Sequence, residues 1–303
     1  MSGLGFVEGF YGRPWSWDER SATAEFLAVS GYSSYLYAPK ADLFLRRRWR
    51  ERWPDETARK LRALAALARA RGLSFGVGLS PHELHVGRAA DEERLVLEKV
   101  EVIVDELGAA HLALLFDDMK GDVPELAKTQ VALAHAVKAR WPKLALSLCP
   151  TYYSLDSALD RLFGPRPPHY LDELGRALDP SIGIFWTGER ICSTSYSLEH
   201  LREVGGWLKR KPLLWDNYPV NDTEKMSPFF DRAARATLGP ELAALVRRDR
   251  ELFQEHGLEK IEPARKTELR AEYGRFSQPG AREVVDWLGG RYAVTSEMVK
   301  EQL

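Results

Sequence analysis

The sequence predicts an α/β protein of the (β/α)8 TIM-barrel type. Short apolar runs alternate with amphipathic stretches, a pattern typical of βα units around a parallel sheet. These units recur about every 30 to 40 residues in a chain of 303, and a barrel of this type usually takes about 250 residues. Polar residues suited to chemistry fall at or just after the ends of the apolar runs, and in a barrel those ends converge on one face.

Seven apolar runs have the length and composition of buried strands. They cover residues 4–10, 33–39, 73–80, 111–118, 143–151, 182–188 and 212–218. A doubly wound open sheet could be built from the same runs. It would spread their polar ends along an edge roughly 30 Å wide, at about 4.8 Å per strand, so only those near its switch point would meet. We therefore favour the barrel.

The amphipathic stretches between the runs predict helices, several of which start at acidic residues and stop at glycine. The clearest start is a capping box formed by Ser16 and Glu19. The expected helices cover residues 16–31, 55–72, 91–108, 124–141 and 197–210.

An eighth strand is not visible, because the periodicity is helical from residue 229 onward. We expect a barrel domain over residues 1–230 and a helical C-terminal segment over residues 231–303. Either Ile261 or residues 292–294 supply a short, irregular eighth strand, or the gap beside the first strand stays open. Neither segment matches the other runs in length or β-branched content, so we favour an open barrel, covered by a C-terminal helix or by a second copy in a homodimer.

Composition excludes several classes of protein. The 43 basic and 44 acidic residues give a net charge of −1, so nothing in the charge favours nucleic acid or an anionic membrane as partner. No stretch approaches the roughly eighteen apolar residues of a membrane span. The two cysteines, Cys149 and Cys192, are too few for a disulfide framework, and the N-terminus lacks the features of a signal peptide. We expect a cytoplasmic protein.

Asp117 and Asp118 end an almost wholly apolar run, which places two carboxylates on the predicted catalytic face. Adjacent strand residues point to opposite sides, so the two should reach different parts of the pocket. Their repulsion would raise the pKa of one and keep the other ionised, which suits a general acid beside an anion. Two alternatives stay open. One aspartate could cap a turn, or the pair could hold Mg²⁺ in a phosphate enzyme. Against the Mg²⁺ site, the sequence contains no phosphate-binding loop and no histidine cluster beyond His82 and His85.

Other residues on this face suit a sugar ligand. Lys40 follows the second run and could donate to a sugar hydroxyl or be an ordinary surface lysine. The only two asparagines, Asn217 and Asn221, share the turn at 215–222, which marks either a site or a common Asn/Asp turn. Aromatic rings can stack on sugar C–H bonds, although each alone is more typical of core packing. The aromatic residues on this face are Tyr11, Trp15, Tyr37, Tyr152, Tyr153, Trp186, Trp215 and Tyr218.

Six motifs together resemble a known family. They are GFVEGFYGRPWSWDER (5–20), SYLYAPKADL (34–43) with WRERWP (49–54), LALLFDD (112–118), LCPTYY (148–153), FWTGERICS (185–193) and LLWDNYPVND (213–222). In order and spacing they resemble the catalytic domain of glycoside hydrolase family 84, which contains O-GlcNAcases and bacterial β-N-acetylglucosaminidases. The resemblance covers residues 4 to about 228. It implies a barrel that hydrolyses terminal β-linked GlcNAc in glycosides, glycoproteins or glycans, with retention and without a cofactor or metal.

The resemblance also implies catalytic roles, in a mechanism where the substrate's own acetamido oxygen attacks the anomeric carbon. Asp117 would orient and polarise the acetamido group and stabilise the oxazoline intermediate. Asp118 would be the general acid and then the general base. Tyr153 would hydrogen-bond the acetamido oxygen, and Asn217 would hold the same group.

The remaining implied contacts position the sugar. Gly9 and Lys40 would bind hydroxyls on the far side of the ring, Asp222 would bind the 4- and 6-hydroxyls, and Trp215 would wall the N-acetyl pocket. The chain departs from the family after this turn, because it contains no Asn-Pro pair and passes directly into helix. A GlcNAc-binding barrel with impaired turnover is therefore the alternative.

Overall fold

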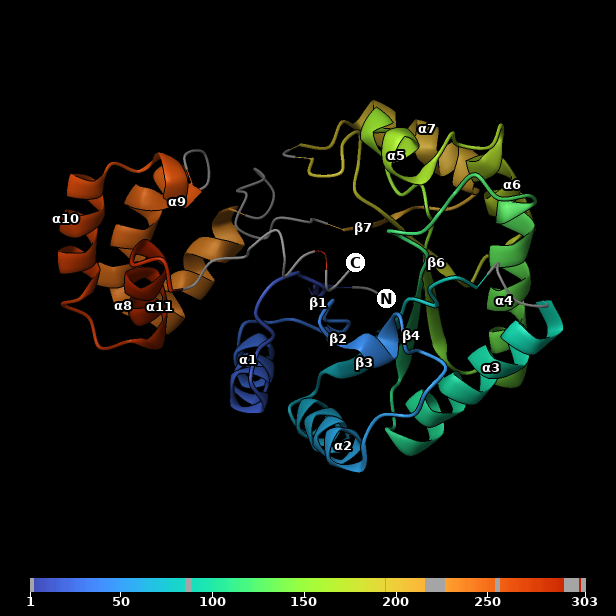
Figure 1. Ribbon diagram of the computed structural model, residues 1–303, viewed down its shortest axis with the longest axis horizontal. Coiled ribbons are helices and arrows are strands. Elements are labelled where there is room, and N and C mark those ends of the chain that lie inside the picture. The colour runs from blue at the N-terminus through green and yellow to red at the C-terminus, as the bar shows by residue number, and fades with distance from the viewer. Residues whose placement is uncertain are drawn as a thin grey trace. The chain divides into compact units, whose positions relative to one another are not determined.

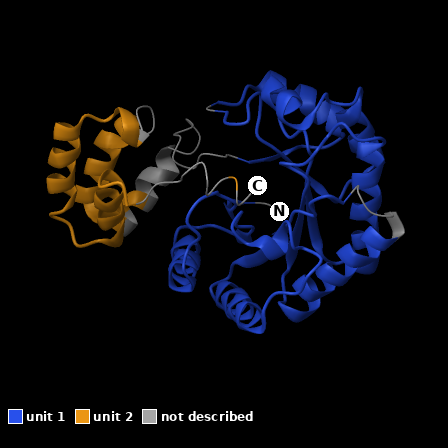
Figure 2. Ribbon diagram, in the orientation of Figure 1, with its two compact units in different colours: residues 1–217, 302–303 blue, residues 218–301 orange. Residues whose placement is uncertain are grey.

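The computed structural model describes residues 3–84, 89–193, 195–215, 227–253, 257–291 and 300. The chain divides into two compact units, residues 1–217 with 302–303 and residues 218–301 (Figure 2). The first unit holds the parallel sheet and the helices that surround it (Figure 1).

All seven predicted strands are confirmed. They are β1 (Gly5–Glu8), β2 (Ser34–Tyr37), β3 (Ser74–Leu79), β4 (His111–Leu115), β5 (Ala145–Cys149), β6 (Gly183–Trp186) and β7 (Leu213–Leu214). Each strand pairs in parallel with the next, and the order along the sheet is the order along the chain. The sheet curls like part of a TIM barrel, with helices on its outer side (Figure 1).

The predicted helices of this unit are also confirmed. They are α1 (Trp17–Val29), α2 (Asp55–Ala70), α3 (Ala89–Glu101) with the π-helical turn η2 (Val102–Glu106), α4 (Leu126–Arg140) and α7 (Leu198–Leu208). The capping box before α1 is present, because Ser16 and Glu19 each accept from the other's backbone N–H. Three short helices were not expected: η1 (Leu43–Leu45), α5 (Ser157–Phe163) and α6 (Tyr170–Ala177).

The sheet is open as far as the described residues show. Among them no eighth strand occurs, and no pairing joins β7 to β1. Ile261, one candidate for the eighth strand, lies between two helices of the second unit and is buried there. The other candidate, residues 292–294, lies outside the described residues. What covers the open edge stays a prediction.

The second unit is built of helices. They are α8 (Ser227–Glu251), α9 (Gly257–Lys260), α10 (Pro263–Tyr273) and α11 (Pro279–Leu288). Gly239, with φ +75°, interrupts α8 just before Pro240. The buried core of this unit consists of Leu242, Ile261, Leu269, Tyr273, Ala281 and Leu288. The boundary expected near residue 230 remains a prediction, because residues 216–226 lie outside the described part.

A glycine in strand β3 allows the segments that follow β2 and end β4 to approach each other closely. A Cβ atom at Gly78 would lie 2.7 Å from Ala38 Cβ and 2.7 Å from Leu115 Cδ1. Ala38 and Leu115 stand two positions before Lys40 and Asp117. Because any side chain at Gly78 would push these segments apart, the glycine helps the ends of β2 and β4 to converge.

None of the helices in the described ranges combines the length with the apolar character needed to cross a membrane.

Candidate active site

The two aspartates stand where β4 ends. The strand before them is buried, and Asp117 itself is only 7% exposed. Asp118 has φ +58°, in the left-handed region that non-glycine residues rarely adopt. The backbone therefore turns at Asp118 instead of continuing as a strand, and the expected alternation of side chains does not apply to the pair.

Lys40 brings the two carboxylates together. Its ammonium donates to Asp117 Oδ2 and to Asp118 Oδ2, each at 2.8 Å, and the lysine is 6% exposed. Burial lowers the pKa of Lys40, but the two carboxylates more than offset this effect and raise the pKa above its ordinary value. The ammonium is therefore charged at neutral pH and is no ordinary surface lysine.

Tyr11, after β1, contacts the same carboxylate. Its hydroxyl donates to Asp118 Oδ2 at 2.6 Å, and the Lys40 ammonium lies 5.4 Å from its ring centroid. Burial, with the neighbouring Asp118 charge, raises the pKa of Tyr11, so the phenol stays protonated and remains a donor. The aromatic pattern placed Tyr11 on this face, but nothing in the sequence showed that it bonds an aspartate.

The electrostatics of Asp118 differ from the expectation of a pKa raised by its neighbour. Burial alone would raise the pKa of Asp118, but the charge and hydrogen bond of Lys40, helped by the Tyr11 hydroxyl, hold it below its usual value. The expectation failed because it considered only repulsion within the pair and left out a cation between them. In this arrangement Asp118 is an anion at neutral pH.

Asp117 has one oxygen with a donor and one without. Lys40 holds Oδ2, whereas the buried Oδ1 has no hydrogen-bond partner among the described residues. Buried carboxylate oxygens are rarely left unpaired, since the loss of hydration costs about 1 to 3 kcal/mol or more. The unpaired oxygen marks an acceptor that suits an N–H or O–H donor of a bound molecule.

Gly9 and Trp215 meet at the open edge of the sheet. Gly9 follows β1 and Trp215 follows β7, and a Cβ at Gly9 would lie 3.4 Å from Trp215 Cζ2. The Trp215 ring also packs edge-on against Phe185 of β6, with centroids 5.1 Å apart. The tryptophan thus lies against the strand end that carries Gly9, as a wall residue would.

Tyr153 is buried, 8% exposed, and follows β5. Burial, with the charges of Asp118 and Asp117, raises the pKa of its hydroxyl. These charges act on Tyr153 because it lies in the same region as the pair. The predicted site residues Asn217 and Asp222 lie outside the described residues.

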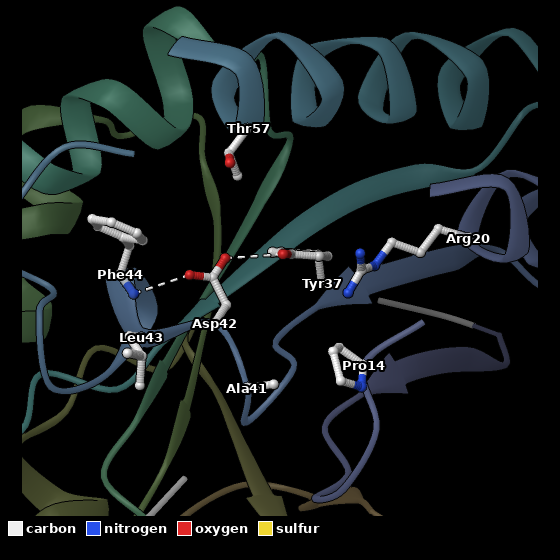
Figure 3. Close-up of a pocket in the computed structure, with 8 residues that line it drawn as sticks. All are labelled: Pro14, Arg20, Tyr37, Ala41, Asp42, Leu43, Phe44 and Thr57. Atoms are coloured by element: carbon white, nitrogen blue, oxygen red, sulfur yellow. Dashed lines mark hydrogen bonds between the residues drawn. The ribbon is translucent and has the colours of Figure 1, made fainter. Parts of the chain in front are cut away.

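Other aromatic residues of the predicted face are structural. Trp186 is fully buried and donates to His200 Nε2 at 3.0 Å, and the Tyr152 hydroxyl donates to the Gly164 carbonyl at 2.7 Å. The Tyr37 hydroxyl points toward Asp42 and donates to its carboxylate at 2.9 Å (Figure 3).

Tyr37 and Asp42 belong to a separate cavity of about 290 Å³, beside the ends of β1 and β2. Its lining residues are Pro14, Arg20, Tyr37, Ala41, Asp42, Leu43, Phe44 and Thr57 (Figure 3). Asp42 also accepts from the Phe44 N–H and from Trp53 Nε1. Its carboxylate is therefore fully engaged by the protein.

Two groups near the pair were not among the predicted site residues. Arg46 is 2% exposed, and none of its three guanidinium nitrogens has a hydrogen-bond partner in the described part of the chain. The half-buried His82 has no such partner at Nε2 either, and burial with the nearby Arg46 charge lowers the pKa of His82 to about 4. Arg46 acts electrostatically on Asp118, Lys40 and Tyr11. Its position in the arginine-rich stretch 46–52 gave no sign that this arginine is the buried one.

Metal-ligand residues do not cluster here. In the described ranges, no three His, Cys, Asp or Glu side chains come together as a metal-binding group. Of the two cysteines, Cys149 is buried and Cys192 is partly exposed.

Comparison with known proteins finds relatives for the barrel. The sequence model of a β-N-acetylglucosaminidase family matches residues 4–245. The chain is 32% identical over 234 residues to the protein O-GlcNAcases of Mus musculus and Rattus norvegicus, across 74% of this chain and 25% of each relative. It thus spans about a quarter of the length of these curated relatives.

A solved structure extends the similarity to the fold. A mutant of the Thermobaculum terrenum O-GlcNAc hydrolase superposes with a TM-score of 0.71 at 25% identity. The superposition covers 90% of this chain and 71% of that one.

Proposed function

The chain belongs to the β-N-acetylglucosaminidase family, glycoside hydrolase family 84, and from this premise we propose that it hydrolyses terminal β-linked GlcNAc with retention, through an oxazoline formed by the substrate. Its substrates are GlcNAc-bearing glycosides, glycoproteins or glycans. We further propose that it works in the cytoplasm, because two cysteines are too few for a disulfide framework, and without nucleic acid or membrane as partner. A homodimer would cover the open sheet edge.

The unpaired oxygen of Asp117 supports this reaction most directly. A 2-acetamido group offers an N–H donor to Oδ1, while Lys40 fixes the carboxylate through Oδ2. As the acetamido oxygen attacks the anomeric carbon, positive charge grows on the amide nitrogen. A fixed carboxylate beside that N–H stabilises the charge where it develops, which lowers the barrier.

The two steps use the pair in sequence. In the first, the bond from the acetamido oxygen to the anomeric carbon forms, the bond to the leaving oxygen breaks, and Asp118 gives that oxygen a proton. In the second, Asp118 takes a proton from water, whose oxygen attacks the anomeric carbon and reopens the oxazoline. No nucleophile from the protein is needed, and substrate-assisted enzymes are an exception to the carboxylate-spacing rule for glycosidases.

Asp118 must hold a proton when substrate is bound, although Lys40 and Tyr11 favour its anion in this structure. We propose that sugar hydroxyls take over the Lys40 ammonium. Losing that bond raises the pKa of Asp118 and allows it to bind the proton it donates.

The remaining predicted contacts stay proposals. Gly9 would bind sugar hydroxyls on the far side of the ring, and Trp215 would wall the N-acetyl pocket. Tyr153 and Asn217 would hold the acetamido group. Asp222 would bind the 4- and 6-hydroxyls.

A single assay separates the candidate functions. The purified protein is given an aryl β-N-acetylglucosaminide, the matching aryl glucoside and an aryl phosphate, with and without a chelator. Substrate assistance predicts hydrolysis of the N-acetylglucosaminide alone, unaffected by chelator. Binding without turnover would indicate an impaired sugar-binding barrel. Phosphate release that a chelator abolishes would indicate a metal-dependent phosphohydrolase. Normal turnover of the glucoside would rule out participation of the acetamido group.

A further inference from the structure

A closed set of hydrogen bonds lies behind the end of β4. Thr151 Oγ1 donates to the Phe116 carbonyl at 2.9 Å and accepts from Gln130 Nε2 at 2.9 Å. Gln130 Oε1 accepts from the Tyr170 hydroxyl at 2.5 Å, and that hydroxyl accepts from the Thr151 N–H at 3.2 Å. Thr151, Gln130 and Tyr170 are each at most 2% exposed. The Thr151 hydroxyl, the Gln130 amide and the Tyr170 hydroxyl thus all form hydrogen bonds within this set.

These bonds hold the peptide that leads into the catalytic pair. The Phe116 carbonyl belongs to the peptide bond that ends at Asp117 N, and the Phe116 N–H donates to the Cys149 carbonyl at 2.9 Å. Both sides of Phe116 are therefore attached to the β5 end. Rotation of this peptide would move the Asp117 side chain directly, since nothing lies between them in the chain.

The far side of the same turn is anchored by the next part of the chain. The Gly121 N–H donates to the Phe163 carbonyl at 2.8 Å, and a Cβ at Gly121 would lie 2.3 Å from the Tyr152 hydroxyl oxygen. The turn that carries the aspartates is thus fixed at both ends by residues 149–163. Such support is needed because Asp118 has a left-handed φ, which residues other than glycine rarely adopt and which persists only where the surroundings impose it.

We propose that Thr151, held by Gln130 of α4 and Tyr170 of α6, is a positioning residue that sets the geometry of Asp117 and Asp118. This inference deepens the proposed function and rests on it. Among the described residues, no hydrogen bond joins the threonine to either aspartate side chain, and its link to the pair is the bond to the Phe116 carbonyl. A misplacement of about 1 Å in a catalytic group can cost about 100-fold in rate, so loss of this hydroxyl should be felt in turnover.

The test compares Thr151→Val, which removes the hydroxyl but keeps the shape, with Thr151→Ser, which keeps the hydroxyl. On an aryl β-N-acetylglucosaminide, Thr151→Val should lower kcat about 10- to 100-fold and leave KM within about twofold. Thr151→Ser should restore kcat to within about threefold of the parent. If Thr151→Val folds poorly, Tyr170→Phe removes the neighbouring hydroxyl and should lower kcat in the same way, by a smaller factor.

Ser147→Ala is the matched control. Ser147 is also fully buried on β5, and its hydroxyl bonds His111 Nε2 at 2.9 Å at the other end of β4. Ser147→Ala loses one buried hydroxyl, as Thr151→Val does, and should keep kcat within about twofold of the parent value. Equal losses in the two variants, or an unchanged kcat in Thr151→Val, would overturn the positioning role. If the parent protein itself hydrolyses no N-acetylglucosaminide, the proposed function fails instead, and this inference falls with it.

Discussion

The Lys40 ammonium lies 2.8 Å from Asp118 Oδ2, so the residue assigned as proton donor is bonded to a buried cation. The same ammonium holds Asp117 at an equal distance. One lysine would therefore control both the charge of the proposed general acid and the orientation of the carboxylate proposed to bind the acetamido group. The proposed catalysis depends on this three-residue arrangement.

Removing the lysine should raise the pKa of the proton donor. In Lys40→Met, burial still disfavours the Asp118 anion, but the ammonium that stabilises this anion most strongly is absent. The basic limb of the profile of kcat/KM against pH should therefore move to higher pH, while kcat/KM itself falls because a sugar contact is lost. Tyr11→Phe should move the limb in the same direction by less.

Lys120→Met provides the control for that experiment. Lys120 is an exposed lysine three positions after Asp117, paired with Asp122 at 3.5 Å. It changes the net charge equally but should leave the pH profile in place, because exposed ion pairs are weak. An unmoved limb in Lys40→Met would show that the lysine does not set the protonation of Asp118.

The two aspartates should respond differently to the leaving group. Asp118→Asn removes the proton donor, so it should spare aryl glycosides whose phenols leave without help. Asp117→Asn removes stabilisation of the oxazoline, which every substrate needs, so it should slow good and poor leaving groups alike. Rates measured on a series of aryl N-acetylglucosaminides decide this, and equal sensitivity of the two variants would argue against the assigned roles.

Much of this arrangement could be predicted from the sequence. The runs that became β2 to β6 could be recognised because parallel strands covered on both sides are apolar on both faces, whereas β1 and β7 at the edges are partly exposed. The aspartates and Lys40 were placed together because they follow those strands. The helices α5 and α6 were missed because they are short and flank the proline-rich stretch GPRPP at 164–168, which favours a loop.

The rest depended on contacts that a pattern does not contain. The rule of alternating sides failed for the aspartates because Asp118 turns with φ +58°, so both side chains reach one ammonium. Arg46 is one of several arginines between residues 46 and 52, and burial alone distinguishes it from Arg48 and Arg52. Long-range packing sets these features, and local composition does not.

Arg46 should not stabilise the fold but should increase the activity of the site. The buried guanidinium loses its hydration without gaining a hydrogen bond to a described residue, and its attraction to Asp118 is opposed by repulsion from Lys40. Arg46→Met should therefore leave the melting temperature unchanged or raise it. The same variant should lower kcat/KM, because the positive charge beside Asp118, Lys40 and Tyr11 is lost. Thermal unfolding and kinetics on one preparation test both parts.

Arg52→Met serves as the comparison, since Arg52 is an exposed arginine of the same stretch and pairs only with Glu106 among the described residues. It should change neither quantity appreciably. If Arg46→Met lowered the melting temperature by several degrees more than Arg52→Met, the buried guanidinium would be shown to stabilise the fold.

Acid should destabilise the barrel through the buried His111. Burial lowers the pKa of His111 to about 4, whereas an unfolded histidine titrates near 6.5. Between these values the unfolded chain binds more protons than the folded one, so the free energy of unfolding falls as the pH drops from about 6.5 to about 4. His82 contributes in the same direction.

Denaturant unfolding at pH 7 and pH 5 measures this loss. His111→Gln removes one titrating group, so the difference between the two pH values should shrink. An equal pH dependence in the parent and the variant would mean that His111 is protonated without penalty in the folded protein.

The most direct test of the central claim changes the substrate and leaves the protein intact. Fluorine atoms on the acetamido methyl group withdraw electrons and weaken the carbonyl oxygen as a nucleophile, while the aryl leaving group stays the same. If that oxygen attacks the anomeric carbon beside Asp117, kcat/KM must fall steeply and steadily from the acetamido to the trifluoroacetamido substrate. A rate that is indifferent to fluorination would contradict substrate assistance, and with it the roles assigned to Asp117 and Asp118.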